Sequence, residues 1–182
     1  MTSIRKEMAI EEVAALVCST LDQHGIRTVL SGGAVVSIYS HNEYQSKDLD
    51  FIAEGISKQV APAMQALGFT KEAGRHWTHP HTEYWVEFPP GPVQVGDAIV
   101  TEHAEISTPF GVLRLLAPTE CVMDRLAAYY HWNDAQGLEQ AVRVAMKCDI
   151  DLDRVEAWSK RERATAKFKN FAEELSARSA QS

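Results

Sequence analysis

The chain has 182 residues, a formal net charge of −7 and 45% hydrophobic residues. This length fits one domain, or a domain with a small appendage, and the hydrophobic content suffices for a buried core. The net negative charge argues against a broad nucleic-acid-binding surface, and no apolar run is long enough to span a membrane.

The N-terminal half alternates helix and strand patterns. In order, the patterns predict a helix at 10–24, a strand at 26–30, a helix at 34–40, a strand at 48–53 and a helix at 57–67. Gly25 ends the first helix, and Ser57 is a candidate N-cap of the third. Pro62 either kinks that third helix or marks its true first turn.

Short strands follow, and then helices. We expect a β-meander at 69–72, 76–78 and 84–88, and a hairpin of strands 104–107 and 112–115 at the end of the sheet. From Pro118 onward the pattern is helical, with Thr119, Asp134 and Asp151 as candidate N-caps. The fold class is therefore α+β: a mixed β-sheet with flanking helices over residues 1–116, and a helical region packed on it over residues 117–182.

The cysteines and the N-terminus bear on the compartment. Cys18, Cys121 and Cys148 are odd in number and scattered, and the first two lie in apolar, helix-like stretches. Buried free thiols are therefore expected in place of disulfides or zinc ligands. Residues 1–6 lack the apolar segment of a secretory leader. Together these features favour a cytoplasmic protein.

A glycine bend joins the first predicted strand to the second predicted helix. Gly32 and Gly33 allow backbone angles and close approaches that a side chain would forbid. The bend lies at the N-terminus of the helix, where free N–H groups and the helix dipole favour a phosphate. Ser31-Gly32-Gly33 is therefore a candidate phosphate-binding turn, and an ordinary turn is the alternative.

Two aspartates follow on the next predicted strand. Because side chains alternate along a strand, Asp48 and Asp50 point to one face, about 6.5–7 Å apart, while Leu49 and Phe51 point into the core. Mg²⁺ prefers oxygen ligands and usually combines one or two carboxylates with substrate phosphates. The aspartates and the glycine bend thus predict a site for a metal and a phosphorylated substrate.

The pattern Ser31-Gly32-Gly33, a fourteen-residue spacer and Asp48-x-Asp50 resembles the nucleotidyltransferase superfamily related to DNA polymerase beta. It is most similar to the minimal nucleotidyltransferases, including the abortive-infection (AbiE-type) toxin enzymes. The resemblance implies a nucleotidyltransferase-like α/β domain at 1–116. It also implies transfer of NMP from an NTP to a hydroxyl with two Mg²⁺ ions, which clamp the attacking oxygen and the α-phosphate.

The resemblance also implies roles for individual residues. Ser31, Gly32 and Gly33 would cradle the β- and γ-phosphates, and Asp48 and Asp50 would hold both metals. A third acid is expected on a neighbouring strand, and Glu87 is the candidate. It would complete the metal that activates the hydroxyl and could accept its proton. Family members usually have aspartate there, and a glutamate paired with an arginine or facing solvent is the alternative.

AbiE-type enzymes also carry a lysine and a further aspartate in the helical half. Asp134 can match that aspartate or be a helix N-cap. Arg125 is the nearest substitute for the lysine in binding the triphosphate, or else pairs with Asp124 or Glu120. Lys47, beside the first aspartate, is a second candidate.

Two clusters outside this pattern have competing interpretations. His76, His79 and His81 lack a convincingly spaced fourth zinc ligand, so an exposed hairpin or an edge that contacts a base and a phosphate is favoured. The aromatic residues at 129–132 either belong to the core or stack a base.

Three functions follow from these features. The first is a magnesium-dependent nucleotidyltransferase acting on RNA such as tRNA, on a protein or on a small molecule, within a toxin–antitoxin or phage-defence pair that has a cognate partner. The second is a catalytically weak binding module or antitoxin with the same fold. The third is an aminoglycoside-type small-molecule nucleotidyltransferase, which the acidic balance permits.

Overall fold

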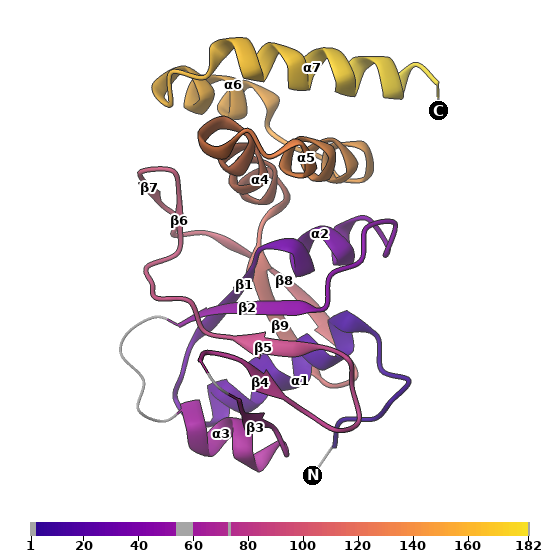
Figure 1. Cartoon of the computed structure of the whole chain (residues 1–182), viewed down its shortest axis with the longest axis vertical. Helices are drawn as coiled ribbons and strands as arrows, with labels where there is room; N and C mark the ends of the chain where they lie inside the picture. Colours follow the sequence, from indigo (N-terminus) through magenta and orange to yellow (C-terminus); the bar gives the residue numbers. More distant parts are fainter. Residues whose placement is uncertain (1–2, 54–59, 73, 182) are drawn as a thin grey trace.

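The computed structural model describes residues 3–53, 60–72 and 74–181 (Figure 1). Its helices are α1 (Ile10–Gln23), α2 (Gly33–Tyr39), α3 (Val60–Ala66), α4 (Pro118–Trp132), α5 (Ala135–Lys147), α6 (Leu152–Arg161) and α7 (Thr165–Ser179). Its strands are β1 (Thr28–Ser31), β2 (Asp48–Ala53), β3 (Thr70–Lys71), β4 (Trp77–Thr78), β5 (Trp85–Glu87), β6 (Gln94–Val95), β7 (Ala98–Ile99), β8 (His103–Thr108) and β9 (Gly111–Leu116). The predicted α+β class is confirmed.

The main sheet has the strand order β3-β4-β5-β2-β1-β9-β8, with β2 in the centre. The pairs β2–β5 and β1–β9 are parallel and the others are antiparallel, so the sheet is mixed. Leu49 and Phe51 of β2 are fully buried, as predicted from the alternation, and so is Val86 of β5. The other face of β2 and β5 therefore carries the polar side chains.

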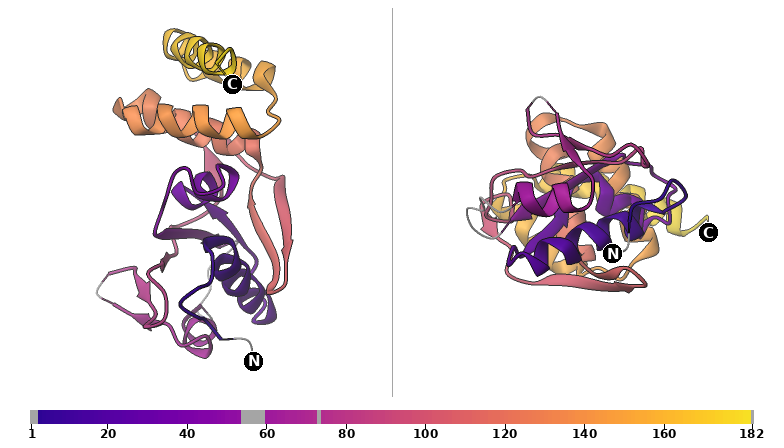
Figure 2. Two further views of the ribbon diagram at one scale, coloured as in Figure 1. Left: turned by 90° about the vertical axis from the view of Figure 1, so that its right-hand side faces the viewer. Right: turned by 90° about the horizontal axis from the view of Figure 1, so that it is seen from below.

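Helices α4–α7 lie together at one end of the molecule, and the sheet with α1 and α3 lies at the other (Figures 1 and 2). Helix α1 packs along β1 and β9 and also contacts α3. Helix α2 contacts both the sheet and helices α4 and α5. The short helix that follows the glycine bend thus bridges the sheet and the C-terminal helices.

The predicted N-caps of the C-terminal helices are partly confirmed. Asp134 accepts a hydrogen bond from the backbone N of Gln136 and caps α5, and Asp151 likewise accepts one from Arg154 and caps α6. The prediction for Thr119 was wrong. Helix α4 begins with Pro118, whose fixed φ suits the first helical position. The Thr119 hydroxyl instead accepts a hydrogen bond from the backbone N of Asp151, at 3.0 Å.

Several strands differ from their predicted bounds. Strand β1 starts at Thr28 and includes Ser31, because Ser31 pairs with Asp50 of β2. The meander and the hairpin are confirmed, with shorter strands in the meander. The small β6–β7 hairpin was not predicted, because its two-residue strands are too short to show an alternating pattern. Pro62 is the third residue of α3, in its first described turn, and Ser57 lies outside the described residues.

The cysteines agree with the sequence-based expectation. Cys18 and Cys121 are buried free thiols, and Cys148 is a half-buried one. Burial raises the pKa of each thiol. Within the described residues, no helix has the length and apolar character needed to cross a membrane.

Candidate active site

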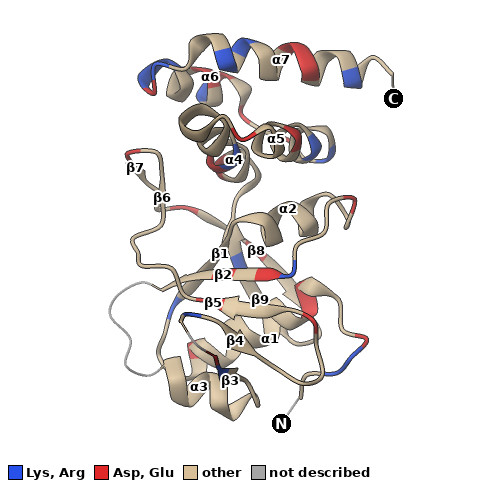
Figure 3. Cartoon of the chain, in the orientation of Figure 1, with Lys and Arg blue, Asp and Glu red and all other residues tan. Residues whose placement is uncertain are grey.

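Three acidic side chains converge on one face of two neighbouring strands. Strands β2 and β5 pair in parallel, with Asp50 opposite Glu87 and Asp48 opposite Trp85. Residues opposite each other in a sheet project to the same face, so Asp48, Asp50 and Glu87 share a face. Figure 3 shows acidic positions in red on β2, at the centre of the sheet.

Burial and the neighbouring acids raise the pKa of both aspartates. Burial, followed by the charges of Asp48 and Glu87, raises the pKa of Asp50 to about 7. Burial and the charge of Glu87 also raise the pKa of Asp48. Both shifts have the sign expected for like charges that share a partly desolvated site. The three acids thus concentrate negative charge on one face of the sheet.

Asp48 carries an unsatisfied atom. Its Oδ1 is buried and has no hydrogen-bond partner of ordinary geometry in the described part of the chain. The same is true of Nε1 of the neighbouring Trp85. The Trp85 side chain nevertheless lies close enough to lower the pKa of Asp48. A buried carboxylate oxygen without a donor is costly, and a cation would remove that cost.

The glycine bend lies against the central aspartate. Gly32 has φ +73°, and a Cβ built there would lie 2.6 Å from Oδ2 of Asp50. The hydroxyl of Ser31 donates a hydrogen bond to the backbone O of Asp50, at 3.3 Å. Gly33 is the first residue of α2. The structure therefore brings the bend and the aspartates together, as the sequence pattern predicts.

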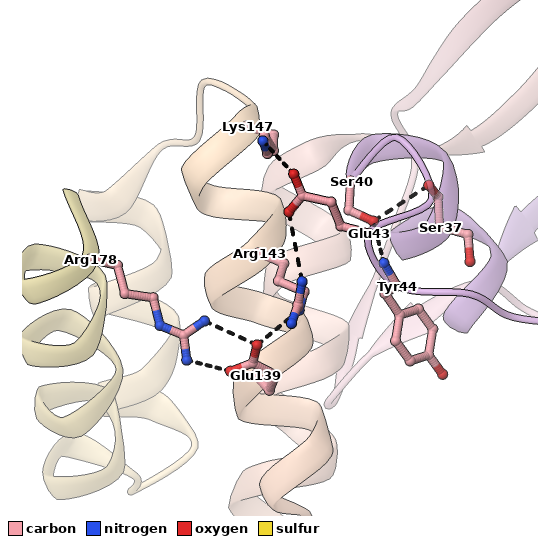
Figure 4. Close-up of polar contacts among 8 residues, drawn as sticks. All are labelled: Ser37, Ser40, Glu43, Tyr44, Glu139, Arg143, Lys147 and Arg178. Carbon is pink, nitrogen blue, oxygen red and sulfur yellow. Dashed lines mark hydrogen bonds and ion pairs between the residues drawn. The ribbon is translucent and has the colours of Figure 1, made fainter. Parts of the chain in front are cut away.

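Serine hydroxyl groups fix the loop between α2 and β2. Ser37 of α2 accepts a hydrogen bond from the backbone N of Ser46, at 2.8 Å. Ser40 accepts one from the backbone N of Tyr44, at 3.2 Å (Figure 4). The hydroxyl of Ser46 donates to the backbone O of Asp48 and accepts from its N–H, at 3.2 Å in both cases. The backbone that presents Asp48 is thus anchored to α2.

Glu87 has a partner other than the arginine or solvent considered from the sequence. Its Oε1 contacts Nε2 of His76, which extends from the segment just before β4. His76 is also close enough to Asp48 to lower the pKa of that carboxyl. In the sequence, His76 is notable only as one of three histidines considered as zinc ligands. The pairing of β4 with β5 is what places it beside Glu87.

Helix α4 brings a further ion pair to the site. Arg125 binds the carboxylate of its neighbour Asp124 through Nε, at 3.0 Å, and through a second nitrogen, and it also reaches Oε1 of Gln140, at 3.4 Å. The charge of Arg125 lowers the pKa of Asp50, while that of Asp124 raises it. Arg125 thus lies near the aspartates, where it would have to be to bind a triphosphate, although it pairs with Asp124. The sequence pattern indicates Asp124 only as an ion-pair partner of Arg125 and does not place it near the aspartates.

Two other candidate residues lie in different surroundings. Lys47 forms an exposed ion pair with Glu83, at 2.6 Å. It directly precedes Asp48, so the alternation along the chain sends its side chain away from the Asp48 face. The carboxylate of Asp134 is engaged as the cap of α5.

The remaining clusters have structural partners. His79 packs on Phe69, with ring centroids 5.1 Å apart, and its ring lies 5.5 Å from that of His81. Tyr130 stacks on the buried Trp158 at 5.4 Å, which places it in the core. Trp132, at the end of α4, is 76% exposed.

The acidic residues of this face supply some, but not all, of the ligands that a divalent cation needs. Asp48 and Asp50 supply oxygen ligands on one face, and the orphaned Oδ1 of Asp48 is available. In the described residues, no three His, Cys, Asp or Glu side chains already stand in an arrangement that would hold a metal ion. The described side chains therefore offer two aspartates on one face without forming a complete metal site.

No protein-family model matches the chain, and no curated protein matches its sequence. Solved structures do match. The crystal structure of an antigenic nucleotidyltransferase-like protein from Paracoccidioides brasiliensis has a TM-score of 0.57 at 11% identity and covers 77% of each chain. The solution structure of the antibiotic-resistance factor ANT(2'')-Ia has a TM-score of 0.53 at 12% identity and covers 95% of this chain and 97% of that one.

A crystal structure of ANT(2'')-Ia in complex with adenylyl-2''-tobramycin gives a TM-score of 0.51 at 12% identity, covering 88% of this chain and 97% of that one. These likenesses extend well beyond the stretch that carries the sequence motif. The chain has a nucleotidyltransferase-like fold.

Proposed function

We propose that this protein is a magnesium-dependent nucleotidyltransferase, which moves an NMP from an NTP to a hydroxyl group. The observation that carries the proposal is the convergence of Asp48, Asp50 and Glu87 on one sheet face, with Gly32 against Asp50. The nucleotidyltransferase-like fold of the whole chain supports it.

The aspartates are the proposed metal ligands. Asp48 and Asp50 would hold two Mg²⁺ ions, which would neutralise charge on the phosphates and activate the attacking hydroxyl. With a pKa of about 7, the Asp50 carboxyl is about half protonated near neutral pH, and a bound cation would favour its ionised form. Glu87 is the proposed third acid, which would bind the same cation or accept the proton of the hydroxyl.

The glycine bend is the proposed triphosphate site. Gly32 lies against the Asp50 carboxylate, so β- and γ-phosphates bound at Ser31, Gly32 and Gly33 would lie beside the proposed metal ligands. Arg125 can add positive charge from α4 if it exchanges Asp124 for a phosphate oxygen. Lys47 would have to leave Glu83 to take part.

Two classes of acceptor molecule are compatible with the proposed transfer. The AbiE-type resemblance of the motif supports a tRNA or protein acceptor and a role in a toxin–antitoxin or phage-defence pair. A small-molecule acceptor is a second candidate, because ANT(2'')-Ia shares the fold and was solved with an adenylylated aminoglycoside. Asp124 lies near Asp50 and, if Arg125 released it, would add an acidic group that suits a cationic acceptor.

Incubation with each α-labelled NTP and Mg²⁺ tests the activity. Total RNA, cell lysate and an aminoglycoside panel are offered separately, and the labelled product is identified. We expect Asp48→Ala and Asp50→Ala to lower incorporation by more than about 100-fold while the circular dichroism spectrum stays unchanged. Asp153→Ala, an exposed acid on α6, is the matched control. Wild-type incorporation by either aspartate variant would disprove the assigned site.

A thermal-shift assay separates the enzyme from a catalytically inert binding module. A ligand at about 100 times its Kd should raise the melting temperature by roughly 5–10 °C in a chain of this size. We expect such a shift with one NTP and Mg²⁺ together, and its loss in Asp48→Ala. The absence of a shift with every NTP would favour the binding module.

A further inference from the structure

We propose that His76 is a positioning residue for the nucleotidyl transfer proposed above, because it holds the Glu87 carboxylate in place beside the aspartates. The inference rests on that proposed function. It adds a residue that the motif of glycines and acids does not include.

The pairing of the strands places His76 at Glu87. Strand β4 pairs antiparallel with β5, with Trp77 opposite Val86, and both of these side chains are buried on the core face. By alternation, the residue before Trp77 projects to the opposite face, which is the face of Glu87. There the Nε2 atom of His76 contacts Oε1 of Glu87.

A second contact fixes the imidazole ring. The ring of His76 lies edge-on to that of Trp85, with centroids 6.3 Å apart and an interplanar angle of 62°. Trp85 lies two residues before Glu87 on the same face of β5. The side chain of His76 is 52% exposed and that of Glu87 only 21%. The histidine therefore covers the glutamate from the solvent side while resting on the tryptophan.

Glutamate at this position explains why a positioning residue is useful. Its side chain has one more rotatable bond than aspartate, and ordering that bond costs conformational entropy. A contact that fixes one carboxylate oxygen removes this cost before the reaction and leaves the second oxygen to bind. Removal of a contact that orients a metal ligand in this way typically changes metal affinity or activity about 10- to 100-fold.

The test compares His76→Ala, His76→Gln and the control His81→Ala, an exposed histidine of the neighbouring turn. The readouts are kcat, KM for the NTP, and Mn²⁺ affinity measured by electron paramagnetic resonance without turnover. We expect His76→Ala to lower kcat and weaken Mn²⁺ binding about 10- to 100-fold, with little change in the KM for the NTP. His76→Gln should recover most of both losses, because its amide N–H can replace Nε2.

Each outcome distinguishes this inference from the proposed function. If wild type binds Mn²⁺ and transfers nucleotide while His76→Ala matches it, the inference fails and the function stands. Tighter Mn²⁺ binding in His76→Ala would also overturn it, since the histidine would then withhold the carboxylate. If wild type transfers no nucleotide, the Mn²⁺ measurement still tests the contact. A wild-type chain that binds no Mn²⁺ overturns both.

Discussion

Gly32 lies directly against the carboxylate of Asp50. A Cβ at position 32 would be 2.6 Å from Oδ2 of Asp50, and the backbone there has φ +73°. Two independent constraints thus require glycine at this position, one from the backbone and one from the neighbouring acid.

Gly32→Ala and Gly25→Ala separate these two constraints. Both glycines have φ +73°, but a Cβ at Gly25 would meet nothing within 4 Å. Both variants should lose about 1–2 kcal/mol of unfolding free energy from backbone strain. Only Gly32→Ala should lose nucleotidyl transfer, because the methyl group must turn the Asp50 carboxylate away. Equal activity of the two variants would contradict the assigned role of the bend.

The raised pKa of Asp50 predicts a pH-dependent stability of the metal-free protein. Its folded pKa of about 7 lies above the ordinary value of 3.8, so the folded state holds this proton more tightly than the unfolded state. The contribution of Asp50 to stability therefore falls as the pH rises from about 4 to 7, and is constant above that range.

Asp50→Asn removes this penalty. In EDTA at pH 8 the variant should melt at a higher temperature than wild type, by about 2–4 °C for each kcal/mol recovered, and at pH 4 the difference should vanish. Added Mg²⁺ should stabilise wild type at pH 8 but not Asp50→Asn. A wild-type advantage at pH 8 in EDTA would contradict the assigned pKa.

Asp134 should act as a helix cap without a catalytic role. Its carboxylate accepts the backbone N–H of Gln136, at 2.9 Å. Asp134→Ala should cost about 1 kcal/mol of unfolding free energy, whereas Asp134→Asn should keep the cap, because asparagine also accepts this hydrogen bond. Nucleotidyl transfer should survive both changes when assayed below the melting temperature. Loss of activity in Asp134→Asn with unchanged stability would restore the catalytic alternative.

A chain of charges joins the loop before β2 to the C-terminal helices. Glu43 pairs with Lys147 at 2.6 Å and with Arg143 at 3.7 Å, Arg143 pairs with Glu139 at 2.8 Å, and Glu139 also binds Arg178 (Figure 4). Because the loop leads into Asp48, this chain of ion pairs links the start of β2 to α5 and α7.

Charge reversal tests this coupling. Glu43→Lys should change the free energy of unfolding little, since Glu43 and its partners are partly exposed. It should speed hydrogen exchange in residues 41–47, and the double variant Glu43→Lys, Lys147→Glu should restore slow exchange at low salt. Unchanged exchange in the single variant would show that the serine hydrogen bonds alone hold the loop.

The sequence by itself determined the local features of this protein. Alternation in 48–53 placed Asp48 and Asp50 on one face and buried Leu49 and Phe51, because side-chain direction in a strand depends only on position along it. The sequence also predicted the glycine bend and the caps at Asp134 and Asp151, since each depends on a few neighbouring residues. The α+β class followed from the order of helix and strand patterns along the chain. Thr119 was misassigned because proline and threonine both favour helix starts, and proline took the first position.

Tertiary structure alone decided which distant residues meet. The register of β2 with β5 placed Glu87 opposite Asp50, and the pairing of β4 with β5 brought His76 to Glu87. The packing of α4 brought Asp124 and Arg125 within electrostatic range of Asp50. Strand register and helix packing depend on the fit of the whole core, and no short segment contains that information.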